Sequence, residues 1–97
     1  MAIIFEIIDK TGRRIHLSKE RWSYITTKHP YMASKLEDIK GALIKPTLIV
    51  PHKFDENMRN YYLLYKEIKR YLHVVVRYLN DEGFVASAFI TRKIIRR

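Results

Sequence analysis

The chain has 97 residues, of which 47% are hydrophobic and 30% charged, and its formal net charge is +9. We expect one globular domain over residues 1–97, because the length suits a single core and the composition is not that of a disordered chain. The absence of cysteine excludes disulfides and thiolate-ligated metal sites, and it fits a cytoplasmic protein. No apolar run reaches the length of a membrane helix, so we expect no membrane partner.

The N-terminal residues predict a β-hairpin. Ala2–Ile8 is rich in isoleucine and phenylalanine, as strands are, and Arg13–Leu17 is typical of a short returning strand. Asp9–Gly12 lies between them and has the composition of a turn, because aspartate suits its first position and glycine adopts positive φ.

Two helices are expected after the hairpin. Ser18 can cap the first helix, whose buried face would carry Trp22, Ile25 and His29. Pro30 interrupts this helix and can begin a second one, which ends at Lys45 because a residue before proline disfavours the α conformation. The second helix has an amphipathic stripe that consists of Met32, Leu36, Ile39 and Leu43.

The second half of the chain predicts four strands, a polar loop and a basic tail. The strands are Thr47–Val50, Met58–Ile68, Arg70–Asn80 and Phe84–Arg92, the loop is His52–Asn57 and the tail is Arg92–Arg97. The predicted fold class is therefore α+β, with the N-terminal hairpin and the two helices packed on a twisted, mainly antiparallel four-stranded sheet.

Strand alternation divides Arg70–Asn80 into an apolar face and a polar face. The apolar face, expected to join the core, consists of Leu72, Val74, Val76 and Tyr78. The polar face consists of Tyr71, His73, Val75 and Arg77. From residue 58 onward nine Lys and Arg stand against three acids, which leaves a local charge of +6. Such a surface favours an anionic partner, RNA or an acidic protein, over a basic surface that is merely solvated.

The residues expected to bind RNA beside Arg77 are cations, tyrosines and one threonine. They are Arg59, Tyr61, Tyr65, Lys66, Arg70, Thr91 and Lys93. Arg59 or Lys66 is expected to hold a phosphate together with Arg77, and the tyrosine rings would stack on bases. The alternative for the tyrosines is packing against the helices, which their β propensity also allows.

The histidines do not predict a metal site. His16, His29, His52 and His73 are scattered without ligand spacing, and the three glycines are isolated, so neither a metal nor another cofactor is expected. What remains is metal-independent cleavage of RNA, in which histidine transfers protons and cations bind the phosphate. His16 and His52 are expected to be ordinary exposed residues.

Three segments resemble one group of nucleases. Trp22–Pro30 (WSYITTKHP) is similar to a helix-ending [H/W]-x-x-I-x-x-[R/K]-H-P pattern, and Tyr71–Arg77 (YLHVVVR) is similar to a YL-x-VVV strand. Gly83–Phe89 (GFVASAF) is similar to a G-x-V-x-[S/T]-A-[F/Y] strand. With these segments the chain resembles the barnase–EndoU–colicin–RelE-like (BECR) ribonuclease superfamily, in its phage-associated toxin branch. The resemblance implies a metal-independent endoribonuclease toxin, which an acidic antitoxin protein would cover.

Carried over residue by residue, the resemblance places a helix-end histidine at His29, a basic strand residue at Arg77 and a small hydroxyl residue at Ser87, all near one cleft. His73 shares a strand face with Arg77, and these four are the predicted catalytic residues. His29 can instead close the helix end against the core, and Ser87 can be a packing residue. Two other classes stay open, namely a non-catalytic RNA-binding or regulatory module and a protein-interaction domain.

Overall fold

The computed structural model describes residues 2–94. The last part of the predicted basic tail, residues 95–97, lies outside the described residues. The elements in chain order are β1 (Ile3–Ile8), β2 (Arg14–Ser18), α1 (Lys19–Lys28), the 3₁₀ helix η1 (Pro30–Ser34), α2 (Leu36–Ile44), β3 (Leu48–Pro51), β4 (Met58–Tyr65), β5 (Arg70–Leu79) and β6 (Glu82–Thr91). The order of strands and helices is the predicted one, except that the second helix is divided into η1 and α2.

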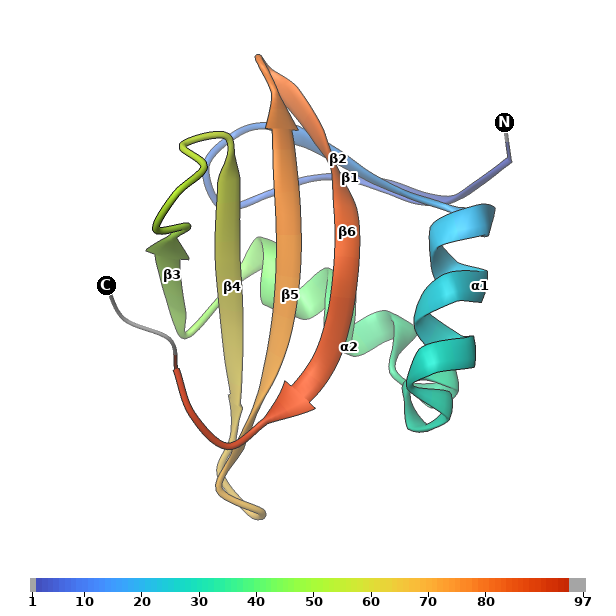
Figure 1. Ribbon diagram of the computed structural model, residues 1–97, viewed down its shortest axis with the longest axis vertical. Helices are drawn as coiled ribbons and strands as arrows, with labels where there is room; N and C mark the ends of the chain where they lie inside the picture. Colours follow the sequence, from blue (N-terminus) through green and yellow to red (C-terminus); the bar gives the residue numbers. More distant parts are fainter. Residues whose placement is uncertain (1, 95–97) are drawn as a thin grey trace.

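The strands form one six-stranded mixed sheet in the order β1-β2-β6-β5-β4-β3. The prediction of a mainly antiparallel four-stranded sheet is therefore wrong, while the α+β class is confirmed. The difference comes from β2, which pairs in parallel with β6 and so adds the N-terminal hairpin to the sheet (Figure 1). Hydrophobic alternation identifies strands but carries no information about a partner this far away in the sequence.

Gly83 allows β2 to lie beside β6. It pairs with Ile15, and a Cβ atom at Gly83 would be 2.5 Å from the carbonyl oxygen of Arg77 and 3.2 Å from the Ile15 side chain. A backbone carbonyl cannot move aside as a flexible side chain can. Glycine is therefore required where the hairpin joins the rest of the sheet.

The core lies between the sheet and α2, which packs on β4 and β5 (Figure 1). Its fully buried members include Ile15, Leu17, Ile25, Met32, Ile39, Leu43, Tyr61, Leu72, Val74, Val76, Val85 and Ala88. The predicted apolar face of β5 is confirmed, because Leu72, Val74 and Val76 are fully buried and Tyr78 is 6% exposed. We call the opposite side of the sheet the distal face, which carries His16, Asn60, Tyr62, His73, Val75, Arg77, Phe84, Ser87 and Phe89.

Helix α1 runs beside β6, past the end of β2 (Figure 1). Its start is the predicted one, because the Ser18 hydroxyl accepts a hydrogen bond of 3.1 Å from the Arg21 backbone amide. Arg21 also donates to the Ala86 carbonyl at 3.5 Å, and the Tyr31 hydroxyl accepts from the Ile90 amide at 3.1 Å. Side chains from α1 and η1 thus contact the backbone of β6 where β2 no longer pairs with it, and they form a wall along one side of the distal face.

Candidate nucleic-acid interface

Arg77, Phe84 and His16 form a row across three neighbouring strands of the distal face. Arg77 on β5 is the direct partner of Phe84 on β6, and Phe84 is the direct partner of His16 on β2. Paired strands lie about 4.8 Å apart, so the α-carbons of Arg77 and His16 are roughly 10 Å apart with Phe84 between them. This spacing leaves a cation and an imidazole on either side of one aromatic ring.

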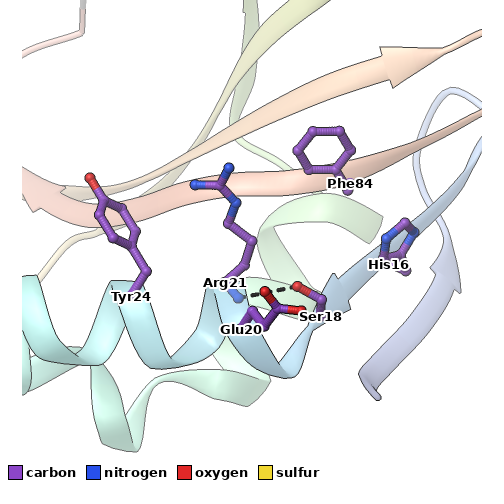
Figure 2. Close-up of a pocket in the computed structure, with 6 residues that line it drawn as sticks. All are labelled: His16, Ser18, Glu20, Arg21, Tyr24 and Phe84. Atoms are coloured by element: carbon purple, nitrogen blue, oxygen red, sulfur yellow. Dashed lines mark hydrogen bonds between the residues drawn. The ribbon is translucent and has the colours of Figure 1, made fainter. Parts of the chain in front are cut away.

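A hollow of about 400 Å³ opens beside this row, between α1 and the sheet (Figure 2). Its lining residues are His16, Ser18, Glu20, Arg21, Tyr24 and Phe84. Figure 2 shows Arg21 and Tyr24 rising from α1 toward β6, with Phe84 and His16 contributed by the strands. We call this the first hollow. It brings together an imidazole, a guanidinium, a carboxylate and two aromatic rings, which include groups able to transfer protons and to bind an anion.

The Arg21 guanidinium is available to an anion. Its contacts are the long hydrogen bond to Ala86 and the Tyr24 ring, whose centroid is 5.7 Å away. Within residues 2–94 no carboxylate lies within ion-pairing distance of Arg21. A phosphate in the first hollow would therefore meet an unpaired cation on an exposed side chain.

Arg77 has an acidic partner. Its Nη1 atom is 2.6 Å from Oδ2 of Asp55, in the loop between β3 and β4, and its side chain is 41% exposed. The Asn57 backbone amide, followed by the Arg77 guanidinium, holds the pKa of the Asp55 carboxyl below its usual range. A cation among valines needs a partner, and Asp55 supplies a carboxylate to Arg77.

His73 lies on the distal face but is enclosed there. It is 3% exposed, its Nε2 is 2.8 Å from the Asn60 side-chain oxygen, and its ring stacks on Tyr62 and contacts Phe89 at centroid distances of 4.5 and 4.7 Å. Burial lowers the pKa of His73 to about 4, which leaves the ring neutral at pH 7. These surroundings correspond to a structural histidine rather than to a proton donor.

His29 lies at the C-terminal end of α1, away from the first hollow. Its backbone amide donates to the Ile25 carbonyl at 2.7 Å, and its half-buried ring contacts Phe89 and Tyr31. Helix α1 has ten residues, so His29 is about 15 Å from the end that carries Ser18. The predicted helix-end position of His29 is confirmed, but His29 and the Arg77–Phe84–His16 row do not form one compact cluster. Ser87 pairs with Val75 between them.

Arg59, Tyr61 and Tyr65 point to the helix-covered side of β4. Arg59 lies over the Tyr78 ring and donates to the Glu56 and Met58 carbonyls. Tyr61 is fully buried, where its hydroxyl donates to Asp9 and lies 2.7 Å from the Tyr78 hydroxyl. The Tyr65 hydroxyl donates to Asp38 of α2 at 2.7 Å. The prediction that these three side chains share an RNA surface with Arg77 is therefore wrong, because each belongs to the opposite phase of the strand.

The remaining predicted RNA contacts lie at the far end of the sheet. Lys66 is exposed in the turn after β4, Arg70 begins β5 and contacts the Ile68 carbonyl at 3.1 Å, and Thr91 pairs with Tyr71. Lys93 is exposed just beyond Thr91. Arg70 is seven residues from Arg77 along β5, or roughly 23 Å. Lys66 therefore does not hold one phosphate together with Arg77.

The expectation that His16 and His52 are ordinary exposed residues is wrong, because both are half-buried and His16 lines the first hollow. Arg21, Tyr24 and Phe84 are not singled out by the sequence. One signal is present, because His16 alternates with Ile15 and Leu17, and a strand that buries both neighbours turns the histidine to the opposite face. What lies beside His16 depends on the parallel pairing of β2 with β6. That pairing has no signal in the sequence.

Comparison of the chain with protein-family models, with curated proteins and with solved structures gave no match. Among residues 2–94 no group of three histidine or acidic side chains is placed to hold a metal ion. In the same residues no helix is both long and apolar enough to cross a membrane.

Proposed function

We propose that the protein binds RNA on the distal face and cleaves it as an endoribonuclease of the BECR type. The observation that carries this proposal is the convergence of His16, Phe84 and Arg77 in one cross-strand row, with Arg21 reaching the same place from α1. Arg21 and His16 line the hollow and Arg77 lies two strands away from His16, a set that suits a phosphodiester, while the Phe84 ring between His16 and Arg77 suits a base.

The chemistry follows from the side chains of the first hollow. A ribose 2′-oxygen attacks the adjacent phosphorus and the bond from phosphorus to the 5′-oxygen breaks, leaving a 2′,3′-cyclic phosphate and a 5′-hydroxyl. Glu20 takes the 2′-hydroxyl proton as general base, and His16 donates a proton to the 5′-oxygen as general acid. Arg21 and Arg77 stabilise the charge that gathers on the non-bridging oxygens, after the phosphate replaces Asp55 beside Arg77.

This proposal moves the centre of the site from His29 and His73 to His16. His29 is the alternative acid–base group, because it is half-buried and lies on the same α1 wall. The two possibilities differ in which histidine variant loses activity.

The test incubates purified protein with single-stranded RNA in EDTA and separates the products. We expect His16→Gln to lower the cleavage rate about 10²- to 10⁴-fold, which is the usual contribution of one general acid or base. Arg21→Ala should also be impaired, whereas Arg70→Ala, a matched arginine at the far end of the sheet, should cleave like the parent. A substrate with a 2′-deoxyribose at the cleavage site should not be cleaved, because it lacks the attacking 2′-oxygen.

Full activity of His16→Gln with loss in His29→Ala would move the acid–base role to His29. Intact RNA in all samples would rule out the proposed ribonuclease activity. RNA binding without cleavage would then support a non-catalytic RNA-binding module, which the occupation of Arg77 by Asp55 favours. An acidic antitoxin, implied by the sequence resemblance, would act by covering the same row.

A further inference from the structure

A second hollow lies on the distal face, on the other side of Arg77. Its volume is about 340 Å³, and it is lined by Pro51, His52, Lys53, Phe54, Met58, Asn60 and Val75. Val75 and Asn60 are direct partners on β5 and β4, and Arg77 pairs with Met58 two residues further along. The second hollow therefore adjoins Arg77, and the mechanism proposed above does not use it.

Phe54 stands at the rim of this hollow with 84% of its surface exposed, more than any other large hydrophobic residue in the described part of the chain. The loop beneath it is held in place. Nδ1 of His52 accepts hydrogen bonds from the Phe54 and Asp55 backbone amides, both at 3.1 Å, and Oδ1 of Asp55 accepts from the Asn57 amide at 2.9 Å. The Phe54 ring is thus presented to solvent on an ordered backbone.

The surroundings of the ring are cationic. The Lys53 ammonium lies 5.1 Å from the Phe54 ring centroid, and the hollow below is lined mainly by apolar groups with the Asn60 amide among them. An exposed ring next to a lysine is the combination that binds single-stranded nucleic acid, because the ring stacks on a base and the cation meets the neighbouring phosphate.

We propose that the loop His52–Asn57 and the second hollow form a base-binding subsite for single-stranded RNA. One base stacks on Phe54 while the adjoining phosphate lies beside Lys53. The subsite rests on the proposed RNA function and narrows its substrate to unpaired RNA, because a base inside a duplex presents no free face to the ring. An RNA strand would then extend from the first hollow, across the Arg77–Phe84–His16 row, to Phe54.

The test measures the affinity of the full chain for a short, uncleavable 2′-O-methyl RNA by fluorescence anisotropy. We expect Phe54→Ala to weaken binding about 5- to 150-fold, the range of base–aromatic stacking, and Phe54→Trp to keep the parent affinity. Ile68→Ala is the matched control, because Ile68 is also exposed and apolar but lies in the turn between β4 and β5. A series of oligonucleotides with one abasic position each should contain one member that binds the parent and Phe54→Ala equally.

Unchanged affinity of Phe54→Ala for the 2′-O-methyl RNA would overturn the subsite. It would also be overturned if Phe54→Ala lost the same affinity for every abasic oligonucleotide, or for a duplex, as for the intact single strand. The parent's cleavage assay separates this result from failure of the proposed function. If the parent cleaves RNA but its binding does not depend on Phe54, only the subsite proposal is rejected. If binding depends on Phe54 but no RNA is cleaved, the subsite proposal is kept and the proposed enzymatic function is rejected. If the parent neither binds nor cleaves RNA, both proposals are rejected.

Discussion

Arg77 and Asp55 form an ion pair, 2.6 Å between Nη1 and Oδ2, that joins the middle of the sheet to the loop before β4. The contact gives Arg77 the partner that its place among valines requires. The side chains of Arg77 and Asp55 are 41% and 31% exposed, so a competing anion can reach them. If the proposed RNA binding is right, we expect an RNA phosphate to compete with Asp55 for Arg77.

Removing the acid from this pair should strengthen RNA binding. Asp55→Asn keeps a side-chain oxygen for the Asn57 amide but no longer attracts Arg77, so we expect affinity at low salt to rise by about twofold to tenfold. Anisotropy titrations measure the change. Glu67→Gln, which removes an equal charge from the exposed turn after β4, controls for net charge and should have a smaller effect. Equal gains in the two variants would show that only total charge matters.

Stability should fall on acidification because of His73. Burial lowers its pKa in the folded protein to about 4, against about 6.5 when unfolded, so between these values the unfolded chain binds the extra proton. The contribution of neutral His73 to the free energy of unfolding is complete above pH 6.5 and is lost as the pH falls toward 4, by up to about 3 kcal/mol. Urea unfolding at a series of pH values measures this slope. His73→Phe should flatten this slope.

The buried hydroxyl of Tyr61 should contribute strongly to stability. Tyr61→Phe leaves a carboxylate oxygen of Asp9 and the Tyr78 hydroxyl without their partner inside the protein, which costs about 1–3 kcal/mol. Tyr24→Phe is the control, because within residues 2–94 its exposed hydroxyl accepts a hydrogen bond only from the Lys28 ammonium, at 3.4 Å. The free energies of unfolding in urea should differ clearly between the two variants. Equal values would contradict a role for the buried network.

Two glycine-to-alanine substitutions should change stability in opposite directions. Gly83→Ala sets a methyl group against the Arg77 carbonyl, where β2 joins β6, and we expect a loss of at least about 2 kcal/mol. Gly41→Ala, inside α2 with no atom within 4 Å of the new carbon, should gain about 0.5–1 kcal/mol from helix propensity. Thermal or urea unfolding compares them. A Gly83→Ala protein as stable as the parent would contradict the close approach of the strands.

The sequence by itself determined the local structure of this protein. The phase of β5, with Leu72, Val74 and Val76 toward the core, follows from an alternation that the backbone imposes on neighbouring residues. The start of α1 at Ser18 follows likewise from a hydrogen bond that spans three residues.

Tertiary structure alone decided the sheet and the composition of the site. His16 comes beside Phe84 and Arg77 because β2 pairs in parallel with β6, and this contact joins residues more than sixty positions apart. His73 and Arg77 share a strand face, yet the first is enclosed by Tyr62 and Phe89 while the second reaches a loop carboxylate. The alternation of a strand fixes which side a residue faces, but the pairing of distant strands determines its neighbours.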